Sequence, residues 1–227
     1  VRLDELQAFA RRSNVSLQTI GQAVFALVSA FYTQSLDITF GSVLSGRDDD
    51  ERSRLLFPTM NTVPIRVILH GSGTDMLRYV QDNFTNIKQW QHYPLRKALS
   101  AAGVDGRLFE SLFIYQKSLE QEQDKGEKLY TSIEGYSDVE YPVCVEMEVV
   151  NEILVWRCAA KEEVFDKEGS KQLLDRMDDV LRHLMNQPET PVIEITAKGT
   201  SVCGLPAFTK KQSCTISSSE TVDGRDV

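Results

Sequence analysis

Five polar or small residues stand at the ends of two expected strands, where such groups commonly face a cleft: Ser45, Gly46, Arg47, Asn61 and Thr62. A long polar loop joins those strand ends, and a loop of this kind usually sits at a site or at a crossing between lobes. Arg47, Asn61 and Thr62 are the strongest candidates. Asn61 and Thr62 have a simpler alternative role, because both side chains can satisfy backbone groups where a strand begins.

His92 has the most motif-like surroundings of the three histidines, and with Tyr93 and Pro94 it forms a second candidate cleft segment. A general base has to be positioned by a second group, and the sequence identifies no such group for His92. A partly exposed structural histidine is therefore the favoured interpretation. The sequence assigns no catalytic residue to this chain.

Two further patterns imitate known sites and fail on chemistry. The run 41–48 imitates the phosphate loop GxxxxGK(S/T), but Arg replaces the Lys that reaches the phosphates and Asp replaces the hydroxyl that binds magnesium. The run Asp48–Glu51 is acidic enough to suggest a cation. Arg47, Arg52 and Arg54 lie beside it, however, and favour a mixed, solvated loop. We therefore expect neither a nucleotide nor a cation there.

The cysteines and histidines do not have the spacing of a metal site. Cys144, Cys158, Cys203 and Cys214 include no CxxC pair, and the histidines are scattered along the chain. We expect no bound metal. Cys144 and Cys158 fall within apolar strand patterns, where buried free thiols are common. This pattern favours a reducing compartment, the cytoplasm.

The composition is that of an ordinary globular chain and argues against two classes of partner. Of 227 residues, 41% are hydrophobic and 26% charged, and the net charge is -8 with a pI of about 5.0. A nucleic-acid surface would need clustered Lys and Arg, and no apolar run reaches the roughly 20 residues that span a membrane. The chain begins Val1-Arg2-Leu3, without an initiator Met or a signal-peptide pattern. We expect it to be a piece of a longer protein.

The hydrophobic periodicity predicts an α/β fold, with one lobe in which helices pack a mixed β-sheet. The expected helices are 1–12, a helix capped by Ser16 and running to Phe31, one capped by Thr74 and running to Ile87, 95–102 after Pro94, and 173–184. The expected strands are 38–44, 63–69, 108–116 and a hairpin over 141–159 that turns at Asn151-Glu152.

The composition changes near Ala197. Residues 199–227 are rich in Ser, Thr, Gly and Lys and contain few large apolar residues. Such a stretch is typical of a flexible linker that need not be ordered. We therefore divide the chain into a folded lobe, residues 1–196, and an interdomain linker, residues 197–227.

One stretch carries a resemblance to a known family. SGR, a loop and then FPTMNTVPIRV, residues 45–67, resemble the C-terminal lobe of a nonribosomal peptide synthetase condensation domain. There, an SGR-type strand end leads into the floor loop and a (V/F)NT(L/V)P(V/I)R-like motif follows. The TMNTVPIR form is most similar to fungal siderophore synthetases of the ferrichrome type. QHYPLR, residues 91–96, resembles (H/N)QD(Y/D)PFE without its acidic residue, and Leu108-Phe109 retain only the end of RDxSRNPLF.

The resemblance implies a chloramphenicol-acetyltransferase-like lobe over about residues 1–196, which is about half of a two-lobed condensation domain. It places the five strand-end residues in the floor loop and tunnel wall. It also implies three partners: the N-terminal lobe of the same domain and the donor and acceptor carrier domains. The carriers present acyl groups as 4′-phosphopantetheine thioesters, and no cofactor binds this lobe directly. The family's catalytic motif HHxxxDG lies in the N-terminal lobe, and no His-His pair occurs in this sequence.

The function that the resemblance implies is amide-bond formation between carrier-bound substrates, in the siderophore biosynthesis of a multidomain nonribosomal peptide synthetase. The isolated chain is then expected to be inactive. Two alternatives stay open. The parent domain can be a degenerate scaffold that only docks carriers, or the lobe can belong to an acyltransferase of the same superfamily that uses coenzyme A.

Overall fold

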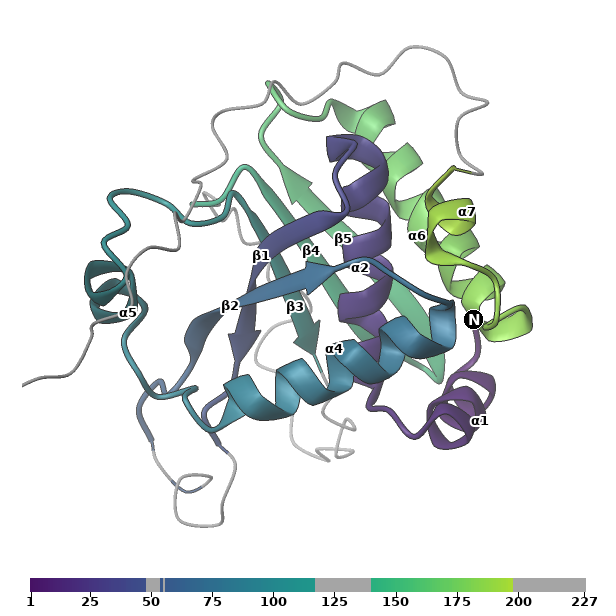
Figure 1. The fold of residues 1–227 in the computed structure, drawn as a ribbon, viewed down its shortest axis with the longest axis horizontal. Helices are drawn as coiled ribbons and strands as arrows, with labels where there is room; N and C mark the ends of the chain where they lie inside the picture. The colour runs from purple at the N-terminus through teal and green to yellow at the C-terminus, as the bar shows by residue number, and fades with distance from the viewer. Residues whose placement is uncertain (48–53, 55, 117–139, 198–227) are drawn as a thin grey trace, which may run out of the picture.

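A five-stranded mixed sheet forms the centre of the molecule in a computed structural model that describes residues 1–47, 54, 56–116 and 140–197 (Figure 1). The strand order is β2-β1-β3-β4-β5. β1 pairs antiparallel with β2 and parallel with β3, and β4 pairs parallel with β3 and antiparallel with β5. The strands are β1 (Asp37–Leu44), β2 (Asn61–Ile68), β3 (Ser111–Gln116), β4 (Val143–Val150) and β5 (Ile153–Ala160). The predicted α/β class with a mixed sheet is confirmed.

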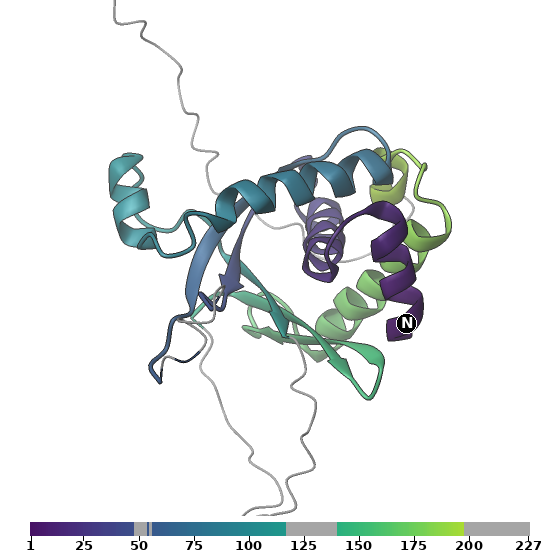
Figure 2. The same ribbon diagram turned by 90° about the horizontal axis from the view of Figure 1, so that it is seen from below.

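Helices cover one face of this sheet. α2, α4 and α6 contact β1, β2 and β5 respectively, whereas α5 stands at one end of the molecule, apart from the other helices (Figure 2). The helices are α1 (Leu3–Ser13), α2 (Leu17–Thr33), α4 (Gly73–Lys88), α5 (Leu95–Ala101), α6 (Lys167–Asn186) and α7 (Val192–Ala197). Of the described helices, none is by itself long and apolar enough to cross a membrane. The pair α1 and α2, bent by 90°, passes that test by length and composition.

Three phenylalanines form the centre of the core between α2 and the sheet. Phe25 of α2 meets Phe40 of β1 edge-to-face, with ring centroids 5.0 Å apart, and lies 5.9 Å from Phe113 of β3. All three side chains are buried. The helix comes this close because Gly21 has no side chain: a Cβ there would lie 2.5 Å from both the Met147 sulfur and the Phe113 ring. α2 is apolar around most of its surface, and this composition allows it to be buried on most sides.

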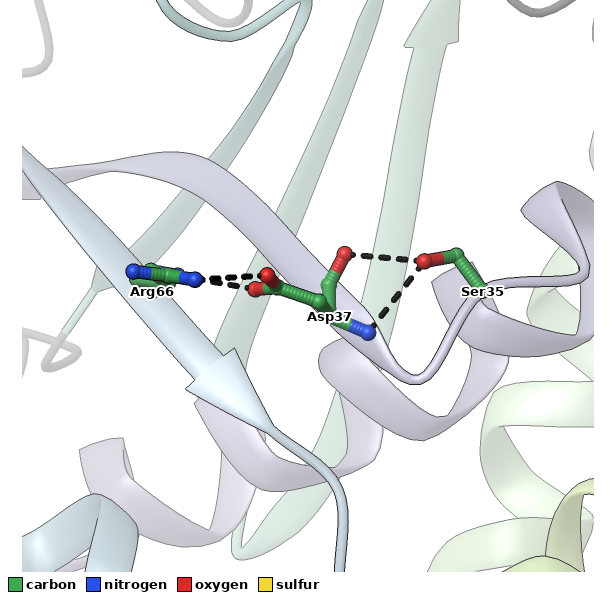
Figure 3. Close-up of polar contacts among 3 residues, drawn as sticks. All are labelled: Ser35, Asp37 and Arg66. Atoms are coloured by element: carbon green, nitrogen blue, oxygen red, sulfur yellow. Dashed lines mark hydrogen bonds and ion pairs between the residues drawn. The ribbon is translucent and has the colours of Figure 1, made fainter. Parts of the chain in front are cut away.

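A surface ion pair joins Asp37, at the start of β1, to Arg66, near the end of β2 (Figure 3). The Arg66 guanidinium donates two hydrogen bonds, of 2.9 and 2.7 Å, to the Asp37 carboxylate. The Ser35 hydroxyl accepts from the Asp37 N–H and donates to the Asp37 carbonyl. The bonds from Arg66 lower the pKa of Asp37. Both side chains are largely exposed, so the pair contributes little to stability and chiefly marks the register of the two strands.

The structure corrects several predicted element ends. The cap of α4 is Ser72, not Thr74: the Ser72 hydroxyl accepts from the Asp75 N–H and the Asp75 carboxylate accepts from the Ser72 N–H, which completes a capping box. Thr74 instead donates a 2.6 Å hydrogen bond to Glu189. Pro94 is the N-cap of α5 rather than part of its first turn. β3 begins at Ser111 rather than at residue 108, and α7 was not predicted.

Other local predictions are confirmed. The Ser16 hydroxyl caps α2 by accepting from the Thr19 N–H at 3.1 Å. The hairpin of β4 and β5 turns at Asn151 and Glu152, whose φ angles of 49° and 62° are both left-handed, as a tight two-residue hairpin turn requires. The predicted solvated loop at Asp48–Glu51 and residues 198–227 of the predicted linker lie outside the described residues, whereas Ala197 is the last residue of α7.

Cys144 on β4 is a free thiol that burial keeps protonated. Burial, and secondarily the neighbouring Glu146, raises its pKa from the ordinary value of 9.0 to about 11. At a given pH below 9, the folded protein should therefore contain roughly 100-fold less Cys144 thiolate than the unfolded chain. We expect iodoacetamide to alkylate Cys144 at pH 8 correspondingly slowly in the folded state, as measured by peptide mass mapping against a urea-unfolded control.

The same shift makes stability depend on alkaline pH. The folded state favours the protonated thiol, so this contribution is fully present below about pH 9 and is lost as the pH rises toward 11. Equal rates of Cys144 alkylation in the folded and unfolded chain at pH 8 would contradict the raised pKa of this thiol.

Candidate functional site

Asn61, at the start of β2, joins the two segments that the sequence singles out. Its side-chain amide donates to the backbone carbonyls of Gln91, at 2.7 Å, and Tyr93, at 3.0 Å, while its oxygen accepts from the Thr62 N–H. One amide therefore holds the turn 91–93 against the end of the strand. Asn61 satisfies backbone groups, as the simpler interpretation expected, and two of these groups lie in the turn 91–93, which contains His92 and Tyr93 of the other candidate segment.

The Ser45-Gly46 turn directly follows β1, whose last residue, Leu44, pairs with Asn61 of β2. The Thr59 hydroxyl donates to the Ser45 carbonyl at 2.6 Å, which ties the chain returning from the loop to the end of β1. Gly46 has a left-handed φ of 67°, and a Cβ on it would lie 2.3 Å from the Thr59 carbonyl oxygen and 3.3 Å from the His92 ring. His92 is exposed and borders this turn.

Arg47 turns back on its own loop. Its backbone N–H donates to the Ser45 hydroxyl at 3.3 Å, and its guanidinium donates to the Phe57 carbonyl at 3.4 Å. The guanidinium thus helps to hold the returning chain beside the end of β1. All eight candidate residues gather at this end of the sheet, and their roles in chemistry stay a prediction.

A cavity of about 500 Å³ opens between β2 and α5. We call it the α5 groove; its lining is mostly apolar and consists of Thr62, Val63, Pro64, Ile87, Trp90, Tyr93, Leu95 and Ala98. Thr62 and Tyr93 were predicted as site residues, whereas Ile87, Trp90 and Leu95 were not. The sequence signal that could have found them is Trp90, a large aromatic residue just beyond the end of an expected helix. In the structure, 64% of the Trp90 surface is exposed.

Apolar side chains also crowd the loop that leads into β2. Phe57 and Met60 are 58% and 70% exposed, and Leu56 beside them is fully exposed. We call these three residues the loop cluster. Large exposed apolar side chains that fall this close together in the sequence are typical of an interaction surface. The cluster directly precedes Asn61, so these exposed apolar side chains adjoin the polar strand end along the chain.

The chemistry available here is binding and positioning. The residues brought together offer a guanidinium, an amide, hydroxyls and aromatic rings, which donate hydrogen bonds or pack but are poor bases at neutral pH. His92 adds an imidazole ring that borders Gly46. Among the described residues, no group of three His, Cys, Asp or Glu side chains is placed to hold a metal ion.

Gly46 provides a test of how tightly the turn is built. Gly46→Ala is expected to lower the free energy of unfolding by about 2 kcal/mol or more, because a left-handed Ala costs about 1–2 kcal/mol and its Cβ also meets the Thr59 carbonyl. Gly103→Ala is the matched control: Gly103 has a φ of 65° with nothing within 4 Å, so only the backbone cost applies. Urea unfolding measures both, and equal losses would contradict close packing at Gly46.

Comparisons with known proteins agree with one another. The family model described as Condensation domain matches residues 2–200. The chain is 71% identical over 208 residues to Nonribosomal peptide synthetase 2 of Cochliobolus heterostrophus, covering 92% of this chain and 4% of that protein. It is 43% identical over 203 residues to Nonribosomal peptide synthetase SIDC of Beauveria bassiana, covering 89% and 4%. The chain therefore spans about 4% of the length of these relatives.

Solved structures show the same fold at low identity. The condensation domain from Monacolin K polyketide synthase MokA superposes with a TM-score of 0.74 at 16% identity, covering 85% of this chain and 47% of that one. The X-domain from teicoplanin biosynthesis gives a TM-score of 0.71 at 15% identity, covering 83% and 46%. At these identities the likeness is one of fold alone.

Proposed function

The chain belongs to the condensation-domain family of nonribosomal peptide synthetases and has its chloramphenicol-acetyltransferase-like fold, and from this we propose that residues 1–196 are the C-terminal lobe of a condensation domain. The coverage supports one lobe of two, since the chain matches 47% and 46% of the two solved structures. In this proposal, residues 197–227 are the linker to the next domain of a multidomain synthetase.

The observation that carries the proposal is the loop cluster beside Asn61. Leu56, Phe57 and Met60 are exposed, although Phe57 and Met60 belong to the stretch FPTMNTVPIRV that resembles the family and Leu56 directly precedes it. A surface of this kind is expected where a second lobe packs and excludes water. We infer that the N-terminal lobe covers the cluster and that the strand end at Asn61 then lines the tunnel between the lobes.

The proposed reaction joins two substrates held by carrier domains as 4′-phosphopantetheine thioesters. The acceptor amine attacks the donor carbonyl, a C–N bond forms, the C–S bond breaks, and the proton lost by the amine ends on the departing thiol. The N-terminal lobe supplies the histidine that assists this proton transfer. The C-terminal lobe, residues 1–196, contributes the tunnel wall and orients the substrates. This positioning role lowers the entropic part of the barrier.

The product class rests on relatives. A protein named Coprinoferrin synthetase, from Coprinopsis cinerea, is 29% identical over 189 residues. Together with the TMNTVPIR motif, this supports a fungal siderophore as the product of the parent synthetase. The free thiols of Cys144 and Cys158 favour a reducing compartment, the cytoplasm. Assays with carriers loaded with different substrates would identify the pair that this domain joins, because a fold does not specify its substrates.

The proposal is tested with the complete two-lobed domain and separately expressed donor and acceptor carriers loaded with candidate substrates. We expect mass spectrometry to detect the amide product on the acceptor carrier. Carrier binding without any product would favour the degenerate scaffold. Product formed from free coenzyme A thioesters, with no carrier present, would favour a coenzyme A-dependent acyltransferase.

A further inference from the structure

α5 is a helix that its own chain leaves largely uncovered. None of its seven residues is buried, in contrast to every other described helix. Both ribbon views place it at one end of the molecule, apart from the other helices (Figures 1 and 2). An isolated helix of this length is unstable in water. Its inner residues Leu95 and Ala98 face the α5 groove, where more apolar surface remains available.

The groove has the composition of a binding hot spot. Trp90 and Tyr93 flank it and are 64% and 47% exposed. Trp, Tyr and Arg are the residue types that carry most of the binding energy at protein interfaces. The volume of about 500 Å³ lies in the range of binding pockets, with room for the apolar side chains of a partner.

The charge around the groove is opposite in sign to that of the whole chain. Residues 83–104 contain three cations, Lys88, Arg96 and Lys97, and lie between Asp82 and Asp105, so residues 82–105 carry a formal charge of +1 in a chain of net charge -8. All three cations are exposed. Because Leu95 and Ala98 face the groove, helical spacing puts Arg96 and Lys97 on the flanks of α5. The groove is therefore apolar inside, and the long cationic side chains stand on the flanks of α5 and at the end of α4.

We propose that the α5 groove docks an acidic amphipathic segment of a protein partner, which inserts an apolar anchor between α5 and β2 and sets its carboxylates against Lys88, Arg96 and Lys97. A peptide segment fits better than a small molecule, because a ligand within the groove would not reach cations on the outer flanks of α5. Docking would also cover α5. This inference rests on the surface alone and goes beyond the proposed condensation reaction.

The test uses the full 227-residue chain and two fluorescein-labelled helical peptides. One carries Leu at i, i+3, i+4 and i+7 with Glu elsewhere, and its counterpart has Lys in place of every Glu. Fluorescence anisotropy at low salt is expected to show the Glu peptide binding at least about tenfold more tightly, with the difference shrinking at 0.5 M salt. Equal affinity for the two peptides, or no saturable binding of the Glu peptide, overturns the proposal.

Charge reversal locates the site. The double variant Arg96→Glu/Lys97→Glu is expected to abolish or invert the preference for the Glu peptide. Lys167→Glu/Lys171→Glu, an identical charge change at two exposed positions of α6, is the matched control and should leave the preference nearly intact. A preference that survives the α5 reversal, or that the α6 reversal removes equally, overturns the assignment to this groove.

Trp90 provides an independent readout. The chain has two tryptophans, so Trp156→Phe leaves Trp90 as the only reporter. Because Trp90 is largely exposed and flanks the groove, the Glu peptide is expected to shift its emission to the blue. Saturable binding without any shift would place the peptide elsewhere and overturn the proposal.

Discussion

Replacing Phe113 by alanine is expected to lower the free energy of unfolding by about 3–5 kcal/mol, which is a large share of the total stability of a domain. Phe113 is fully buried, and its ring lies 5.9 Å from Phe25 and 6.5 Å from Phe40. Removing it leaves a cavity where α2, β1 and β3 meet, and the close approach at Gly21 leaves neighbouring groups little freedom to fill it. Urea unfolding followed by circular dichroism measures the loss.

Phe57→Ala is the matched control, since the same side chain is removed from an exposed position of the loop cluster. Its effect on stability should stay within about 0.5 kcal/mol. A loss of less than about 1 kcal/mol in Phe113→Ala would mean that the three rings are not the centre of the core.

Asn61→Ala is expected to reduce kcat/KM for condensation by the complete two-lobed domain about 10- to 100-fold. The change removes both bonds that hold the turn 91–93, at 2.7 and 3.0 Å, and leaves two carbonyls without these donors. Displacement of a substrate-positioning element by about 1 Å can cost on the order of 100-fold in rate. The measurement is the initial rate of amide product on the acceptor carrier.

Asn83→Ala controls for general destabilisation. The Asn83 amide donates a 2.8 Å hydrogen bond to the Arg66 carbonyl, a bond of the same kind at the other end of β2. Both variants should lose similar stability, about 1 kcal/mol, while only Asn61→Ala loses turnover. Wild-type turnover in Asn61→Ala, or an equal fall in both variants, would remove Asn61 from the positioning residues.

Local patterns predicted the fold wherever one short-range signal dominates. The alternation of Val143, Val145 and Met147 predicted a half-buried strand, and these three residues are buried on the helix-covered face. The helical breaks at Asn14 and at the Ser16 cap are likewise local. The α4 cap was misplaced because Ser72 and Thr74 are both good caps, and only the carboxylate of Asp75 decides between them.

Contacts distant in sequence account for what the sequence left open. Asn61 and the turn 91–93 were both singled out, but thirty residues separate them and nothing local indicates that one amide bonds to that turn. The α5 groove combines residues of β2, the end of α4 and α5, so no single stretch carries its pattern. In the run 41–48, a local pattern imitated a phosphate loop. Its first four residues instead form the end of β1, where Gly41 packs against Phe109.

The most direct test of the central claim compares the 227-residue chain with the same chain joined to its N-terminal lobe. Both are supplied with donor- and acceptor-loaded carriers, and the amide product is quantified by mass spectrometry. We predict product with the joined lobes and none above background with the chain alone, because the catalytic histidine motif is absent from this sequence. Turnover by the chain alone would contradict the account of this protein as one lobe of a two-lobed enzyme.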